Sequence, residues 1–269
     1  MIRSHLSTFV HQRLECVANI DQKLWPDDQL PFMPFFRATR PSLRQALMAP
    51  NGKVNILVEV KKASPSCGEL SQVSALELCK NYVNAGAQAL SVLVDQPNFK
   101  GHPQDLLDGV THYPQLPFLF KDFVATAYQV RLAKALGASA VLLMSQLLEW
   151  PEMQDLFALA RELGLEAFVE CHDLEELERA LTLHPPIVGI NSRDFKDPKL
   201  TIDLGTAPRL LKQLSSPWPA TTALVAQSGL SSGADLEQLL AACPKGLPHA
   251  VQIGSSLSLA GTLPAWLKP

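Results

Sequence analysis

Charged side chains follow several short apolar runs of this sequence, at positions where a strand would end. Glu59 and Lys61 close the first run, and Lys121 follows the third. Glu170 ends the fifth run, and Arg193 follows the sixth. Because side chains alternate along a strand, Glu59 and Lys61 would share one face. Each residue alone has an ordinary structural explanation, but two lysines, two glutamates and an arginine gathered in one place are typical of an acid–base catalytic site.

Small residues follow the last two apolar runs. Ser228 and Gly229 come after the seventh run, and Gly254 and Ser255 come after the eighth. The backbone N–H groups of small residues can approach an anion closely, and barrel enzymes often bind phosphate at this place. The sequence therefore predicts a phosphate site there, with ordinary turns as the alternative explanation.

The histidines and cysteines do not indicate a metal site. His172 lies two residues after Glu170, and it either lines the same site or belongs to a loop. No HxxxH spacing occurs, and the five cysteines are an odd number without CxxC spacing. This pattern argues against a zinc site or a disulfide framework, and it favours a reducing compartment. We expect no metal and no cofactor.

The elements that must position these residues alternate between strands and helices. Near-continuous apolar runs separated by helical segments predict a parallel sheet covered by helices. Eight such units favour an α/β fold of the (β/α)8 TIM-barrel type, in which function sits at the carboxyl ends of the strands. An open doubly wound sheet is the alternative, although no GxGxxG follows the first run. The predicted strands are Val54–Val60, Ala89–Val94, Pro117–Phe120, Ala138–Met144, Glu166–Glu170, Ile187–Ile190, Ala223–Ala226 and Ala250–Ile253. Predicted helices include Ala75–Ala85, Ala127–Leu136, Met153–Leu163, Leu174–Leu183, Ala207–Leu214 and Asp235–Ala242.

The first fifty residues have a different pattern. Apolar residues from Ile2 to Ile20 recur at spacings of three and four, which predicts an amphipathic helix that packs on the rest of the protein. Pro31–Phe36 predicts an extended connector, because proline disfavours a helix. Ser42–Met48 predicts a short helix with Ser42 as its N-cap. We expect a single barrel domain over residues 1–269, with an N-terminal helical extension at 1–48 and the barrel strands and loops at 54–257.

The composition of the chain limits the classes of partner that can be expected. Hydrophobic residues make up 47% of the chain, charged residues 18%, and the net charge is −3. Such a balance is ordinary for a packed globular protein and gives no reason to expect nucleic acid or an anionic membrane. The apolar runs are too short to span a bilayer, and the N-terminus lacks the features of a signal peptide. We expect a cytoplasmic monomer that acts on a small molecule.

With these motifs in place, the chain resembles the indole-3-glycerol phosphate synthase family. The match covers about residues 40 to 257, and the SPSxG, KDF, GINxRD and xSGL patterns together are highly specific to that family among phosphate-binding barrels. The matching segments, in the family's order, are Glu59–Gly68 (EVKKASPSCG), Ala89–Gly101 (ALSVLVDQPNFKG), Pro117–Gln129 (PFLFKDFVATAYQ), Ala138–Met144 (ASAVLLM), Val169–Asp173 (VECHD), Gly189–Asp194 (GINSRD), Gln227–Leu230 (QSGL) and Ile253–Leu257 (IGSSL).

The resemblance implies a barrel with an extra helix over its mouth and a carboxy-lyase reaction of tryptophan biosynthesis. The implied substrate is 1-(2-carboxyphenylamino)-1-deoxyribulose 5-phosphate, which undergoes ring closure, decarboxylation and dehydration without a metal or redox cofactor. The resemblance implies that Lys121 is the general acid of ring closure and Glu170 the acid/base of dehydration, with Lys61 and Glu59 as a charged pair beside Glu170. It places Asn191 and Arg193 at the anthranilate end of the substrate. The other implied substrate-binding residues are Ser64, Gln227, Ser228, Gly229, Gly254 and Ser255.

The chain departs from the family's pattern at four positions. Gln227 stands where the family usually has glutamate, and Cys67 where lysine is common. Val94 replaces a usual threonine, and Ser192 a usual asparagine. An alternative function is therefore a degenerate paralogue that binds a sugar phosphate with weak or no turnover. The phosphoribosyl anthranilate isomerase of the same pathway fits less well, because the cysteine and aspartate it would use do not stand at the matching strand ends.

Overall fold

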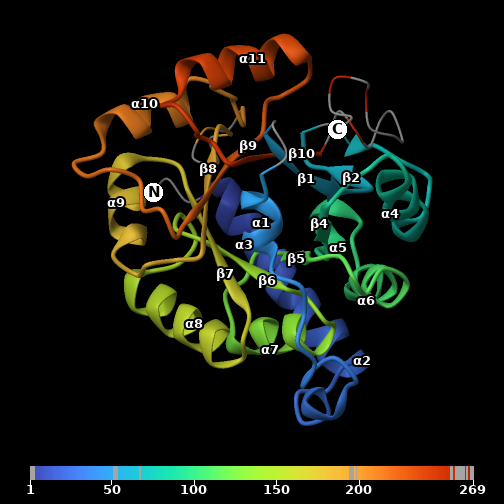
Figure 1. Cartoon of the computed structure of the whole chain (residues 1–269). Coiled ribbons are helices and arrows are strands. Elements are labelled where there is room, and N and C mark those ends of the chain that lie inside the picture. Colours follow the sequence, from blue (N-terminus) through green and yellow to red (C-terminus); the bar gives the residue numbers. More distant parts are fainter. Residues whose placement is uncertain are drawn as a thin grey trace.

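Eight parallel strands close into a barrel, with helices around it (Figure 1). The computed structural model describes residues 4–50, 54–66, 68–193, 197, 199–254, 257, 264 and 266. The strand order is β1-β10-β9-β8-β7-β6-β5-β4, so β1 pairs with both the last strand and the next barrel strand along the chain. The bounds are β1 Asn55–Val60, β4 Ala89–Leu93, β5 Phe118–Lys121, β6 Ala140–Met144, β7 Glu166–Cys171, β8 Ile187–Asn191, β9 Ala223–Gln227 and β10 Ala250–Ile253. The predicted (β/α)8 barrel is confirmed, and the open sheet is excluded.

Side chains alternate between two apolar clusters along the strands. In β1, Leu57 belongs to the cluster inside the barrel, whereas Val58 and Val60 belong to the cluster between the strands and the outer helices. Glu59 lies between those two valines, so it shares the inner face with Leu57. Lys61 continues that face into the barrel mouth. Strands buried on both faces explain why their sequences read as nearly continuous apolar runs.

The outer helices follow the strands in turn. They are α4 Ala75–Asn84, α6 Pro103–His112, α7 Ala127–Ala135, α8 Trp150–Glu162, α9 Leu174–Leu181, α10 Thr206–Gln213 and α11 Gly233–Ala242, with the short α5 Gln96–Phe99 after β4. The six predicted helices are confirmed, with their ends shifted by a few residues. Helix α8 starts earlier than predicted because Glu149 and Glu152 form a capping box and Pro151 is tolerated in a first turn.

The N-terminal segment contains the two predicted helices and an unpredicted turn. Helix α1 spans Ser4–Cys16 and continues through the π-helical Val17–Asp21 into α2, Gln22–Leu24. Helix α3 spans Leu43–Met48, and the Ser42 side chain caps it by accepting a hydrogen bond from the backbone N–H of Gln45. The extended connector expected at Pro31–Phe36 is wrong, because Leu30–Phe32 forms a 3-10 helix and residues 34–37 form a turn. Proline is compatible with that turn, since the first N–H groups of a helix have no intrahelical partner.

The two N-terminal helices lie at opposite ends of the barrel. Phe9 of α1 stacks on Phe123, just beyond the carboxyl end of β5, with ring centroids 6.2 Å apart. At the other end, the Ser42 hydroxyl donates to the carboxylate of Glu166, which begins β7, over 2.5 Å. The helix over the mouth is therefore α1, as predicted, while α3 covers the amino ends of the strands. No helix within the described ranges is long and apolar enough to cross a membrane.

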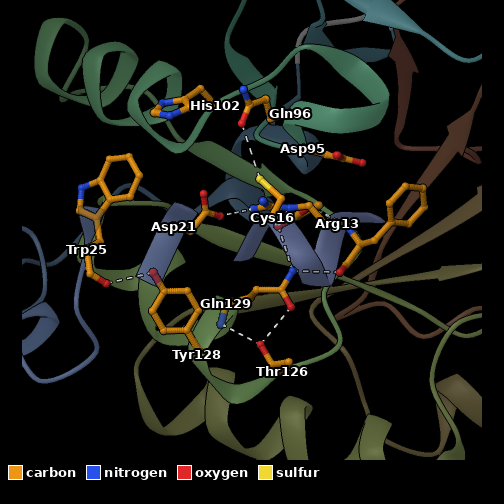
Figure 2. A network of polar contacts seen from close by, with 12 residues as sticks. Arg13, Cys16, Asp21, Trp25, Asp95, Gln96, His102, Thr126, Tyr128 and Gln129 are labelled. Carbon is orange, nitrogen blue, oxygen red and sulfur yellow. Dashed lines mark hydrogen bonds and ion pairs between the residues drawn. The ribbon is translucent and has the colours of Figure 1, made fainter. Parts of the chain in front are cut away.

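A buried arginine attaches α1 to the rim of the mouth (Figure 2). The Arg13 side chain is fully buried, and its Nε and Nη2 donate to the two carboxylate oxygens of Asp122 over 2.7 and 2.8 Å. Arg13 Nη2 also lies 2.6 Å from a carboxylate oxygen of Asp21. Gln129 donates a further hydrogen bond of 2.9 Å to Asp122. Burial alone would lower the pKa of Arg13, but the two carboxylates outweigh it and raise that pKa.

A third carboxyl group, Asp95, lies at the edge of this network. Its oxygens accept hydrogen bonds from the backbone and side-chain amides of Asn98, and the Asn98 amide also donates to the backbone carbonyl of Phe9. Burial and the neighbouring Asp122 raise the pKa of Asp95 to about 7, against the opposing effects of Asn98 and Arg13. Asp95 thus joins β4 and α5 to the helix that covers the mouth.

Replacing Arg13 with methionine is expected to lower the free energy of unfolding by about 3–5 kcal/mol, because Asp122 and Asp21 would stay buried without their cation. Urea unfolding followed by circular dichroism measures the change. The control is Arg131→Met, which breaks a partly exposed ion pair with Asp27 and is expected to cost at most about 1 kcal/mol. Equal losses in the two variants would contradict the importance of the buried attachment.

Candidate active site

A cavity of about 310 Å³ opens at the carboxyl ends of the strands, under α1. The predicted site residues that line it are Glu59, Lys61, Ser64, Lys121, Asn191, Arg193, Gln227, Ser228, Gly229 and Gly254. Glu170 lies next to it, in the wall of an adjoining recess. Ser255 and Cys67 fall outside the described residues. The structure therefore brings together every described residue that the sequence singled out.

The first ion pair comes from β1 and the residue after it. Lys61 Nζ lies 2.6 Å from Glu59 Oε1, and both side chains are at most one-tenth exposed. Burial would raise the pKa of Glu59, but Lys61, Lys121 and hydrogen bonds to its oxygens hold that pKa below its usual value. Glycine is required at position 254, because a Cβ there would clash with the Glu59 carboxylate. This packing makes Gly254 a structural neighbour of the ion pair as well as part of the predicted anion site.

The second ion pair joins β5 to β7. Lys121 Nζ lies 3.3 Å from Glu170 Oε2, and the Glu170 side chain is only 1% exposed. Asn191 donates to Glu170 Oε1 over 3.1 Å, and Gln227 donates to Oε2 over 2.9 Å. Burial would raise the pKa of Glu170, but Lys121, His172 and these two amides outweigh it and lower that pKa. Glu170 is therefore ionised at neutral pH and ready to accept a proton.

Two glutamines connect the ion pairs. Gln227 Nε2 donates to Gln252 Oε1 over 2.8 Å, and Gln252 Nε2 donates to Glu59 Oε2 over 2.8 Å. Together with the bond from Gln227 to Glu170, these contacts form a continuous chain between the two carboxylates. Sequence analysis missed Gln252; the available signal was a polar side chain inside the apolar β10 run. Gly189 leaves the room for Gln227, because a Cβ there would clash with its amide oxygen.

An apolar recess adjoins Lys121 and Glu170. Its apolar walls come from Leu93, Phe99, Phe123, Leu142 and Met144. Sequence analysis missed these residues as site residues, because their apolar character identifies them only as core. Its lining also contains Lys121 and the carboxyl groups of Asp95, Asp122 and Glu170. With a volume of about 40 Å³, the recess extends the main cavity and suits the apolar edge of an aromatic ring.

Arg193 forms part of the opposite wall. Its backbone N–H donates to Asn191 Oδ1 over 3.0 Å, and its guanidinium donates to the carbonyl of Leu200 over 3.3 Å. These bonds hold the side chain at the cavity, where a planar guanidinium can bind a carboxylate. Ser64 sits across the cavity in a short hairpin formed by β2 Ala63–Ser64 and β3 Gly68–Glu69.

The turn after β9, where the sequence predicts an anion site, has an unusual backbone geometry. Ser228 and Gly229 both adopt positive φ angles, of 67° and 88°. Successive residues in turn conformations can direct their N–H groups toward one anion. Just before α11, Asp235 accepts bonds from the backbone N–H groups of Ser231 and Ser232. These two N–H groups are therefore engaged within the protein, and the turn itself stays the predicted place for an anion. No cluster of three or more metal-ligating side chains occurs among the described residues.

The fold and the site together define a (β/α)8-barrel enzyme whose ionisable groups meet at the carboxyl ends of the strands. The chain belongs to the indole-3-glycerol phosphate synthase family, because a sequence profile of that family matches residues 6–263. The substrate class that this family implies is a small phosphorylated molecule.

Proteins of the same name in several bacteria are similar to this chain. The indole-3-glycerol phosphate synthase of Carboxydothermus hydrogenoformans is 42% identical over 221 residues, which cover 80% of this chain and 79% of that protein. The Opitutus terrae protein of that name is 38% identical over 226 residues, covering 82% and 81%. The Burkholderia vietnamiensis protein is 41% identical over 192 residues, covering 71% of each.

Solved structures with low sequence identity share the fold. N-acetylmannosamine-6-phosphate 2-epimerase from Clostridium perfringens superimposes with a TM-score of 0.59 at 12% identity, covering 82% of this chain and 92% of that one. Thiamine phosphate pyrophosphorylase from Pyrococcus furiosus gives a TM-score of 0.55 at 13% identity, covering 84% and 93%. At such low identity the likeness concerns the architecture alone.

The turn geometry predicts that a negative charge at position 228 weakens anion binding. Ser228→Asp is expected to weaken the binding of inorganic phosphate at least about tenfold, which corresponds to about 1.4 kcal/mol. Ser228→Asn is the control, because asparagine has the same size and tolerates the left-handed backbone but carries no charge. Isothermal titration calorimetry measures both affinities. Equal affinities for the two variants would place the anion elsewhere.

Proposed function

We propose that this chain converts 1-(2-carboxyphenylamino)-1-deoxyribulose 5-phosphate to indole-3-glycerol phosphate, CO2 and water. The observation that carries the proposal is the arrangement of two buried lysine–glutamate pairs between an apolar recess and an anion-binding turn. Membership of the indole-3-glycerol phosphate synthase family supports the same reaction. The substrate has an aromatic carboxylate at one end, a phosphate at the other and a ketone between them, so each part has a matching region of the cavity.

Binding both ends of the substrate would bend its flexible chain. The turn at Ser228 and Gly229, with Gly254 opposite, binds the phosphate, and the recess beside Lys121 takes the aromatic ring. Arg193 orients the ring's carboxylate. Holding two anionic ends in fixed places brings the reacting carbons together and removes much of the entropic cost of ring closure.

Lys121 would start the chemistry. Its ammonium donates a proton to the ketone oxygen while the ring carbon that bears the carboxylate bonds to the ketone carbon. The carboxylate then leaves as CO2, and its bonding electrons restore the aromatic ring. The product of these two steps is a cyclic alcohol.

Dehydration completes the indole. The hydroxyl group leaves as water with a proton from the site, and Glu170 accepts the proton released from the neighbouring carbon. Only the ionised form can act as a base, and the lowered pKa of Glu170 keeps the group in that form before the reaction. Glu59 holds Lys61 close to the same place, so that a second ammonium faces the substrate.

The remaining expectations concern the setting of the enzyme. A reducing, cytoplasmic location is proposed from the sequence, in which five cysteines without CxxC spacing argue against a disulfide framework. A monomer is the proposed oligomeric state, and a single domain over residues 1–269 is the proposed organisation. Sedimentation velocity on the purified chain measures the oligomeric state, and the number of unfolding transitions measures the number of domains.

Lys121→Ala is expected to abolish product formation, because no other proposed residue donates to the ketone oxygen. Indole fluorescence that develops after addition of substrate measures the reaction. The control is Lys80→Ala on the exposed face of α4, which is expected to keep full activity. Turnover above a few per cent of wild type in Lys121→Ala would contradict the assigned role. A wild-type chain that binds substrate without any fluorescence change would instead support the degenerate paralogue.

Gln227→Glu is expected to move the acidic limb of the pH–rate profile to higher pH. A carboxylate at this position would face Glu170 at hydrogen-bond distance, and two adjacent carboxylates share a proton, which raises the pKa of Glu170. The base form then appears only at higher pH. Gln227→Met removes the donor without adding a charge, so its limb is expected between those of wild type and Gln227→Glu. Coincident limbs in wild type and Gln227→Glu would show that the titrating base is not Glu170.

A further inference from the structure

His172 lies between two carboxylates on the outer side of the proposed base. Its Nε2 is 3.5 Å from Glu170 Oε1, and its Nδ1 is 3.3 Å from Glu176 Oε2. The side chains of His172 and Glu170 are 5% and 1% exposed, whereas that of Glu176 is 15% exposed. The three groups therefore lead from the buried base toward solvent.

Local structure fixes this array. Glu176 lies in the first turn of α9, and its Oε2 accepts a 2.8 Å hydrogen bond from the backbone N–H of His172. Asp173 caps the same helix by accepting from the backbone N–H of Glu176 over 2.9 Å. These bonds place the Glu176 carboxylate beside the imidazole ring, which contacts it through Nδ1.

The ring also faces a second cavity of about 260 Å³. Asn191 and Arg193 separate this cavity from the substrate cavity, because they line both. Besides His172, the charged or ionisable groups that face this second cavity are Asp173, Arg193, Asp203 and Arg209. The other described residues that line it are polar: Gln146, Asn191, Ser192, Thr201 and Thr206. A polar cavity of this size holds several waters.

The proposed reaction requires a proton from solvent. The substrate's carboxylate leaves as neutral CO2, so one proton is taken up in each turnover. Lys121 loses a proton in ring closure, and the departing hydroxyl takes another, whereas Glu170 gains only one. At that stage the substrate fills the mouth beside Lys121, and the nearly complete burial of Glu170 prevents direct exchange with solvent.

We propose that His172 relays protons from the second cavity to Glu170, and through Glu170 to Lys121; this inference rests on the proposed function. His172 Nε2–H gives its proton to Glu170 Oε1, and Nδ1 takes a proton from a water of the second cavity, whose hydroxide passes to the solvent. Glu170 Oε2 returns a proton to Lys121 Nζ across 3.3 Å. The ring ends with the same number of protons but as the other tautomer, and it returns to the first tautomer by exchanging its proton with water between turnovers. Imidazole suits this task because it exchanges protons near neutral pH.

The relay acts only through Glu170, so His172 is a positioning residue rather than a catalytic one. A purely structural role would be preserved by His172→Gln, whose amide can still donate to Glu170 but cannot pass a proton on. A relay predicts that His172→Gln lowers kcat at least about tenfold with little change in KM. Glu176→Gln is also expected to lower kcat. His112→Gln, on the exposed surface of α6, is the control and is expected to match wild type.

Chemical rescue tests the relay directly. In His172→Ala the second cavity gains room for a free imidazole, so added imidazole is expected to raise kcat in proportion to its concentration. Wild type and Lys121→Ala are expected not to respond. A His172→Ala variant that imidazole leaves unchanged, or a His172→Gln variant with wild-type kcat, would overturn the relay.

A second readout is independent of turnover. The 15N chemical shift of His172 Nε2, followed by nuclear magnetic resonance, is expected to change in Glu170→Gln, because this nitrogen lies 3.5 Å from the Glu170 carboxylate. An unchanged chemical shift would overturn the coupling even if the chain proved inactive. Absence of indole fluorescence with wild type would instead overturn the proposed function, so the two failures are distinguishable.

Discussion

The mouth of this barrel is organised by the need to pair charges that are buried away from water. An unpaired buried carboxylate costs several kcal/mol, so Glu59 and Glu170 each require a cation and further donors. Lys61 and Lys121 supply the cations, and a chain through Gln227 and its neighbouring glutamine supplies the donors. The two ion pairs are therefore parts of one network, and a change at either end alters the environment of the other.

The same constraint attaches the cover to the site. Asp122 directly follows Lys121 in sequence, and its carboxylate is held by Arg13 from the helix above the mouth. The backbone that carries the proposed general acid is thereby fixed from the outside by the N-terminal segment and from the inside by Glu170. Stability and geometry of the site cannot be separated here, because the same contacts provide both.

Sequence reasoning succeeded where local pattern determines structure. The barrel strands are buried on both faces, so their apolar runs mark them clearly, and alternation was enough to pair Glu59 with Lys61. Sequence reasoning failed where tertiary contacts determine the role of a residue. Gln252 is a polar residue in a core strand, and its hydrogen-bond partners come from two other strands. The placement of α3 at the far end of the barrel depends on contacts with Glu166 and similarly distant residues. The roles of the site residues came from family resemblance rather than from pattern.

The attachment of the N-terminal segment also has a consequence for the order of folding during synthesis. Arg13 binds an aspartate 109 positions later, and Ser42 binds a glutamate 124 positions later. The helix that carries Arg13 can therefore complete its contacts only after residue 122 has been translated, and the helix that Ser42 caps only after residue 166. Until then the apolar surface of both helices is exposed, so contact with other chains competes with completion of the barrel.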